Sequence, residues 1–149
     1  MSTCQICGRI IKAPAGVIAH HGYRRPGCGW QTASCMGAKH FAYELSCDRI
    51  AAAIQSVQTF VDNASTNLDI LNSNPPKTIT FSINRKSYTV DKPDNFNPDT
   101  AKGCFYFMPR TYENEYMKKI HELKSAIKSA RIDLNFLKER LAKWVAPVA

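Results

Sequence analysis

The sequence predicts a mainly α protein with a small β component, in which an N-terminal zinc module precedes an antiparallel two-helix coiled-coil hairpin. Two long stretches carry apolar residues at alternating spacings of three and four, which is typical of helices that pair through one stripe. Cysteine and glycine are concentrated near the N-terminus, where a short segment has little core of its own. We therefore expect a zinc module over 1–43 and a helical hairpin over 44–149.

The length and composition exclude several classes of protein. A chain of 149 residues forms one domain or two small modules. The uncharged stretches of its first half, such as 26–38 and 50–61, have at most 13 residues, whereas a bilayer-spanning helix needs about 20 apolar ones. The N-terminus lacks the basic start and apolar run of an export signal, so we expect a cytoplasmic protein with no membrane partner. In a reducing compartment, clustered cysteines favour metal binding over disulfides.

A CxxC motif opens the predicted zinc module. The two residues between Cys4 and Cys7 let both thiolates turn toward one point, and Gly8 relieves crowding after the turn. A redox pair is disfavoured, because thioredoxin-like CxxC motifs follow a strand within a longer βαβ pattern. The motif therefore predicts half of a tetrahedral site for one Zn²⁺ per chain.

The other two ligands come from a histidine and a further cysteine. In an extended segment neighbouring side chains face opposite sides, so only one of His20 and His21 reaches the metal. With His21, the pattern reads Cys4-x2-Cys7-x13-His21-x13-Cys35. Cys28, which lies between two glycines, is the rival to Cys35 as the fourth ligand.

The N-terminal segment resembles a group of small zinc-finger-like proteins, mostly uncharacterised, from bacteria and their phages. Three motifs within residues 4–48 carry this resemblance: Cys4-x2-Cys7, His21-Gly22-Tyr23-x-Arg25-Pro26-Gly27-x-Gly29 and Ser34-Cys35-x-Gly37-Ala38. The resemblance implies that Cys4, Cys7, His21 and Cys35 are the metal ligands, and that Cys28 is not one of them. It implies no settled activity.

Basic and aromatic residues are interleaved in the same segment. Residues 1–43 carry five basic side chains and no acidic one. Aromatic rings can stack on unpaired bases while neighbouring cations contact phosphates, as in proteins that bind single strands. The candidate nucleic-acid contacts are Arg9, Lys12, Tyr23, Arg24, Arg25, Trp30 and Lys39. In the alternative interpretation, Tyr23 and Trp30 pack over the metal site and Arg25 hydrogen-bonds the adjacent loop.

Two helices are expected in the remainder, over 47–72 and 112–145. Ser46 and Thr111 are the predicted N-caps, and prolines follow both predicted C-termini. A helix with one narrow apolar stripe is not stable alone in water, so the two helices should pair in antiparallel fashion. This pairing would place Trp144 near Tyr43 and Leu71 near Tyr112. Apolar residues outside the second stripe leave room for a further packing surface, including a homodimer formed through the helices.

An inserted β-hairpin is expected over 77–108. The segment 78–83 alternates with a period of two, 88–90 returns after a polar turn, and 104–108 offers a third strand. The turn displays Arg85 and Lys86, which are candidate partner-binding residues. In the alternative interpretation, the hairpin is only a soluble cap on the helices.

These features together predict a non-enzymatic zinc protein that binds DNA or RNA. The sequence shows no Ser/His/Asp order, phosphate-binding glycine loop or HExxH motif, and a zinc ion with four protein ligands has no position for water. The alternative is a phage-encoded interaction module or inhibitor that docks on the acidic surface of a host nucleic-acid-processing or defence protein.

Overall fold

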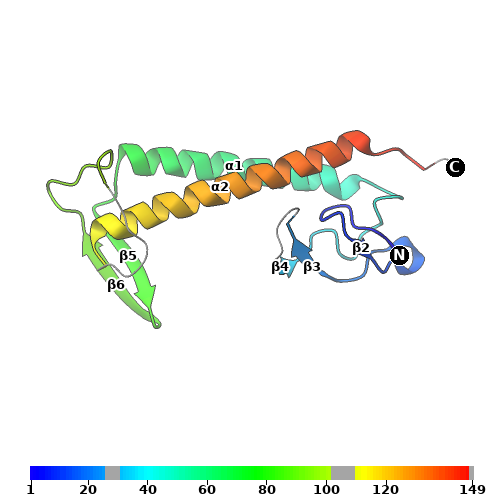
Figure 1. The fold of residues 1–149 in the computed structure, drawn as a ribbon, viewed down its shortest axis with the longest axis horizontal. Coiled ribbons are helices and arrows are strands. Elements are labelled where there is room, and N and C mark those ends of the chain that lie inside the picture. The colour runs from blue at the N-terminus through cyan, green and yellow to red at the C-terminus, as the bar shows by residue number, and fades with distance from the viewer. Residues whose placement is uncertain (26–30, 102–109, 148–149) are drawn as a thin grey trace. The chain divides into compact units, whose positions relative to one another are not determined.

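The computed structural model describes residues 1–25, 31–101 and 110–147, with the side chains of 31 and 32 left out (Figure 1). The chain divides into two compact units. Unit 1 comprises Met1–Val61 and Ser129–Ala149, and unit 2 comprises Asp62–Lys128. Both long helices therefore contribute residues to both units.

Unit 1 begins with two small antiparallel hairpins. The strands are β1 (Ser2–Thr3) with β2 (Ile10–Ile11), and β3 (Gly22–Arg24) with β4 (Gln31–Ser34). A 3-10 turn, η1 (Pro14–Gly16), lies between the hairpins, and it ends at Gly16 with a φ of +77° that favours glycine. Short strands and turns thus account for most of the regular structure of the N-terminal segment.

Helix α1 (Asp48–Ser73) begins within one residue of its predicted start. The hydroxyl of Ser46 accepts a hydrogen bond from the Asp48 amide at 3.2 Å, as expected of a residue that caps the helix. In addition, Gln5 Oε1 accepts a hydrogen bond from the Arg49 amide at 3.0 Å. The N-terminal segment therefore supplies one of the acceptors that the first turn of α1 needs.

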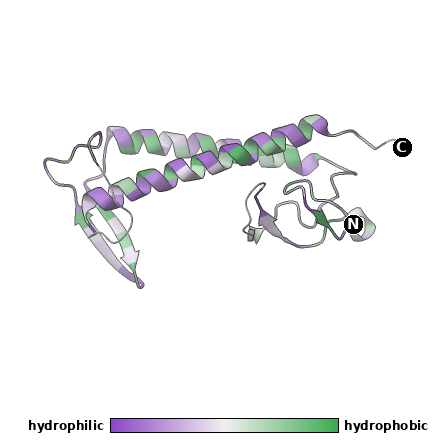
Figure 2. Ribbon diagram, in the orientation of Figure 1, coloured by the Kyte–Doolittle hydropathy of each residue, from purple (hydrophilic) through white to green (hydrophobic). Residues whose placement is uncertain are grey.

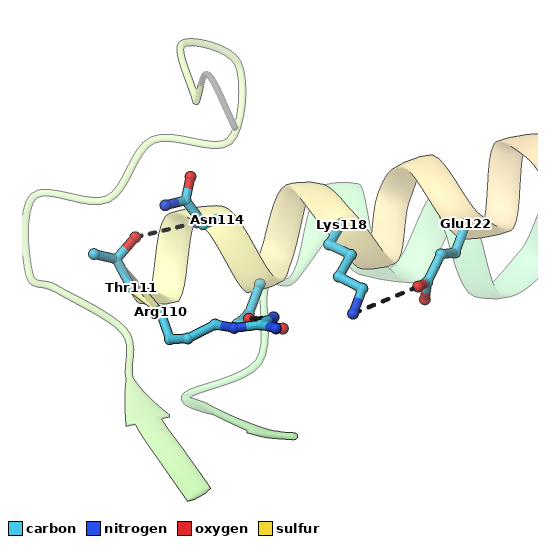
Figure 3. A network of polar contacts seen from close by, with 6 residues as sticks. Arg110, Thr111, Asn114, Lys118 and Glu122 are labelled. Atoms are coloured by element: carbon cyan, nitrogen blue, oxygen red, sulfur yellow. Dashed lines mark hydrogen bonds and ion pairs between the residues drawn. The ribbon is translucent and has the colours of Figure 1, made fainter. Parts of the chain in front are cut away.

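Helix α2 (Tyr112–Lys143) has the predicted Thr111 cap, whose Oγ1 accepts a hydrogen bond from the Asn114 amide at 3.3 Å (Figure 3). Its first turn is acidic and its last turn is basic, which complements the helix dipole. Arg110 forms an ion pair of 2.6 Å with the buried carboxylate of Glu115. Figure 2 shows polar and apolar residues interleaved along both helices.

The core of unit 1 joins the N-terminal segment to the helices. Ile50 and Ala53 of α1 and Leu137 of α2 share one buried cluster with residues of the zinc module. The module's members of this cluster are Cys4, Ile6, Cys7, Ile18, Cys35 and Ala42. The expected proximity of Trp144 to Tyr43 is confirmed, since Trp144 Nε1 donates to the Tyr43 carbonyl at 2.7 Å.

Unit 2 has its own core beneath the predicted β-hairpin. β5 (Thr78–Ile83) pairs with β6 (Lys86–Asp91) in antiparallel register, and Ile79 is buried against Tyr112, Tyr116 and Ile120 of α2. Leu71 packs against the same cluster, as expected. The tight turn places Asn84 and Arg85 at positive φ. The predicted third strand, 104–108, lies outside the described residues.

The predicted fold class, mainly α with a coiled-coil hairpin, is wrong. The described residues form two α-helices and three separate two-stranded sheets, although α1 and α2 do contact each other. The physical reason is that the apolar stripes do not pack only on each other. In unit 1 they also cover the zinc module, and in unit 2 they also cover the β-hairpin. Within the described part of the chain, neither helix is long and apolar enough to cross a membrane.

Candidate metal centre

Four side chains converge at the predicted metal site. Cys4 and Cys7 lie in the turn between β1 and β2, His21 directly precedes β3, and Cys35 directly follows β4. Their ligand atoms all lie within 4.8 Å of one another, and the three cysteines are buried. The two N-terminal hairpins thus each contribute two ligands.

The distances within this cluster fit a tetrahedral ion. Zinc–sulfur bonds of about 2.3 Å and zinc–nitrogen bonds of about 2.0 Å place tetrahedral S···S pairs about 3.8 Å apart and S···N pairs about 3.6 Å apart. The Sγ atoms of Cys4 and Cys35 are 3.7 Å apart, and Cys7 Sγ is 3.4 Å from His21 Nε2. A disulfide would require a sulfur separation of about 2.0 Å. These two distances match a tetrahedral ion, and the four ligand atoms, all within 4.8 Å of one another, could hold a metal ion.

Backbone turns aim the cysteines at one point. The Gly8 amide donates to the Cys4 carbonyl at 3.1 Å, and Gly8 has a φ of +70°, which explains the glycine after the CxxC motif. Opposite, the Ala38 amide donates to the Cys35 carbonyl at 3.0 Å. A Cβ atom at Gly37 would collide with Cys4 Sγ, so only glycine lets the two turns approach this closely.

The hydrogen bonds of the two histidines explain why only one is a ligand. His21 Nδ1 lies 2.9 Å from the Ala19 carbonyl, to which it donates as Nδ1–H, and this tautomer leaves Nε2 with its lone pair directed at the cluster. His20 is exposed and its Nε2 lies 3.0 Å from Ser34 Oγ. The alternative left open between His20 and His21 is thus resolved in favour of His21. The rival cysteine, Cys28, lies outside the described residues.

All three sulfurs of the cluster would be charged together only around a cation. Hydrogen bonds from Cys35 and then Cys4 lower the pKa of the Cys7 thiol, whereas hydrogen bonds with Cys4 and Cys7, followed by burial, raise the pKa of Cys35. The raised pKa keeps the Cys35 thiol protonated in the absence of a metal, whereas a positive ion between the sulfurs would favour the thiolate form of all three. With four protein ligands, a tetrahedral ion would have no position for water or substrate, which is the coordination of a structural site.

Two arginines donate hydrogen bonds to backbone carbonyls around the cluster. Arg140 of α2 donates from Nε to the Gln5 carbonyl and from Nη2 to the Cys4 carbonyl, both at 3.1 Å. Its guanidinium also lies 4.0 Å from the centre of the Tyr43 ring, and burial lowers its pKa. Arg9 donates to the Gly22 carbonyl, linking the first hairpin to the second. Both cations lie near a site that carries a net charge of about −1 when zinc is bound to three thiolates.

The other predicted nucleic-acid contacts fall into two groups. Arg9, Tyr23 and Arg25 are partly buried, and Arg25 pairs with Asp133 of α2 at 2.9 Å. Burial, and then the Asp133 carboxylate, raise the pKa of Tyr23. In contrast, the side chains of the predicted contacts Lys12, Arg24 and Lys39 are exposed. Trp30 lies outside the described residues. The predicted partner-binding residues Arg85 and Lys86 are exposed at the turn of unit 2.

The sequence did not reveal the roles of Gln5, Asp133 and Arg140. Gln5 is fully buried between the cysteines, and its amide donates to the Phe41 carbonyl at 2.9 Å and to Asp48 at 3.0 Å. A polar residue inside a CxxC motif is a weak signal for such a role. Asp133 and Arg140 carry no local signal, because the hydrogen bonds of their side chains join them to residues more than 100 positions away.

Comparisons with known proteins add no further assignment. No protein-family model, no curated protein and no solved structure matches this chain.

Proposed function

We propose that this chain is a non-catalytic zinc protein whose N-terminal module binds nucleic acid. Zinc binding is supported by two distances, Cys4 Sγ to Cys35 Sγ and Cys7 Sγ to His21 Nε2, which agree with those of tetrahedral zinc. Three sulfurs and one imidazole form a ligand set typical of structural zinc. Zinc would hold the two hairpins together and keep the buried face of the module against the helix ends.

The distribution of charge supports nucleic-acid binding by the N-terminal module. Unit 1 contains ten basic and four acidic side chains, so it carries +6 of the total of +8. Zinc with three thiolates reduces this to about +5. Lys12, Arg24 and Lys39 are exposed on the metal-binding segment, where they can contact phosphates.

The metal is tested by elemental analysis of protein purified without added zinc. We expect one equivalent of zinc per chain, and loss of the metal in Cys35→Ser, because a hydroxyl replaces one thiolate. A wild-type protein with less than about half an equivalent would contradict the proposal.

Nucleic-acid binding is tested by fluorescence anisotropy with labelled single strands over a salt series. Replacing Lys12, Arg24 and Lys39 together by alanine should weaken binding and reduce the slope of log K against log [salt] by about 0.7 per lost contact. The matched control replaces Lys77, Lys86 and Lys92, which are exposed in unit 2, and should leave binding largely unchanged. Equal losses in both triple variants would show that total charge, not this module, drives binding.

Absence of binding at about 50 mM salt would contradict the nucleic-acid proposal while leaving the zinc proposal intact. The docking of unit 1 on an acidic protein surface would then become the better explanation of its charge.

A further inference from the structure

A cavity of about 210 Å³ lies within unit 1, beside the metal cluster. Ser34 and Met36, which contribute to its wall, flank the predicted ligand Cys35. Among the described residues, the part of the lining that matters for a ligand is Ile6, Tyr23, Ala53, Val57, Asp133 and Leu137. An apolar cavity of about 150 Å³ is known to admit benzene. This cavity is therefore large enough for a planar heterocyclic ring.

One charged group interrupts the apolar wall. The side chain of Asp133 is 13% exposed, and it accepts hydrogen bonds from Arg25 Nε at 2.9 and 3.1 Å. The Tyr23 side chain also hydrogen-bonds this carboxylate. A carboxylate offers about four acceptor positions, so about one remains for a ligand. A carboxylate in an apolar wall favours a ring that carries N–H donors.

The surroundings of the cavity favour an anion outside it. Arg25, which pairs with Asp133 of the cavity wall, has a side chain that is 37% exposed, so part of it faces solvent. Unit 1 as a whole carries +6 by the count of its ionisable side chains. A ligand that fits has a planar ring with an amine and a negatively charged remainder, which are the parts of a nucleotide.

We propose that this cavity binds one unpaired, amine-bearing base of a single-stranded nucleic acid. The base lies between Tyr23 and the aliphatic side chains of Val57 and Leu137, its exocyclic amine donates to Asp133, and its phosphate lies toward Arg25. This inference rests on the proposed nucleic-acid function and adds a preference among bases to it. A duplex would not serve, because its bases are stacked and their edges paired.

The first test compares labelled oligo(dC) with oligo(dT) of about ten nucleotides by fluorescence anisotropy at neutral pH. Cytosine carries an exocyclic amine where thymine carries a carbonyl oxygen, which the Asp133 carboxylate would repel, so the wild-type protein should bind oligo(dC) about tenfold more tightly. Asp133→Leu removes the acceptor and should bring this ratio close to one. The ratio is the informative quantity, because the loss of a negative charge strengthens phosphate binding for both strands.

The second test fills the cavity. Val57→Phe should weaken binding of oligo(dC) about tenfold, since the new ring occupies the space of the base. Ser56→Phe is the matched control, because Ser56 is exposed on the same helix and does not line the cavity. If Val57→Phe loses its zinc, Ala33→Phe provides the same test from an exposed position in the lining.

The outcomes separate this inference from the function on which it rests. Equal affinity for the two strands, with no effect of Val57→Phe or Ala33→Phe, would overturn the base site while salt-dependent binding upheld the proposed function. No binding of either strand would overturn both. The cavity would in that case suit an apolar side chain of a partner protein.

Discussion

Arg140 links the N-terminal segment to α2, and its replacement should lower both the stability of that segment and its affinity for zinc. Its guanidinium donates to the carbonyls of Cys4 and Gln5 at 3.1 Å each and lies 4.0 Å from the centre of the Tyr43 ring. A hydrogen bond from a charged donor contributes about 1.5–3 kcal/mol, and a desolvated cation–π contact contributes about 2 kcal/mol. Desolvation of the guanidinium, which lowers the pKa of Arg140, offsets part of this gain.

We therefore expect Arg140→Ala to destabilise the folded module by about 3 kcal/mol. Because the folding of a small zinc module is coupled to metal binding, the same change should weaken zinc affinity about 100-fold. Competition with a chromophoric chelator measures this affinity directly. Arg140→Lys keeps the charge but lacks the planar fork that serves two carbonyls, so it should lie between wild type and alanine.

Lys143→Ala is the matched control in the last turn of α2. Its side chain is 78% exposed and lies 3.9 Å from Glu139, an arrangement that contributes less than about 0.5 kcal/mol. Zinc binding by Arg140→Ala within about threefold of wild type would contradict this prediction, because the loss of two partly buried hydrogen bonds from a charged donor costs more than that.

Three further predictions concern the site, the tyrosines and the metal. Gly37→Ala should abolish stoichiometric zinc binding, because its Cβ would collide with Cys4 Sγ; elemental analysis detects this, and a full equivalent of zinc would contradict it. Burial raises the pKa of Tyr23, Tyr112 and Tyr116, so their contribution to stability is complete below the ordinary pKa of about 10 and is lost as pH rises. An ultraviolet titration should show late ionisation of three tyrosines in the native protein and none in guanidinium; normal titration of all of them would refute their burial. Chelation of the metal should abolish the near-ultraviolet circular dichroism of unit 1 and retain helical signal from unit 2, which has its own core. An unchanged spectrum would show that zinc is not needed for the fold.

The metal cluster could be predicted from the sequence because its signals are local. The CxxC spacing, the glycine at position 8 and the single histidine facing one side each follow from short-range geometry. The two helices were predicted within about two residues at each end by the same kind of local pattern, and the cap at Thr111 was correct. The position of Trp144 beside Tyr43 then followed from an antiparallel pairing of the helices.

The contents of the two cores could not be predicted in this way. A narrow apolar stripe shows that a helix is covered on one face, but it does not show by what. The stripe residue Ile50 packs with Cys4 and Ile18 of the zinc module as well as with the other helix, so the coiled-coil interpretation failed. Similarly, positive charge suggested that Arg9 contacts nucleic acid, whereas its side chain donates to the Gly22 carbonyl inside the module.

The proposed zinc site with four protein ligands is tested most directly by the coordination of the bound metal. X-ray absorption spectroscopy at the zinc edge reports the kind, number and distance of the ligands in the intact protein. We expect three sulfurs at about 2.3 Å and one nitrogen at about 2.0 Å, with the nitrogen lost in His21→Ala and retained in His20→Ala. A first shell with two or fewer sulfurs, or with bound water in place of the imidazole, would contradict the four-ligand structural site.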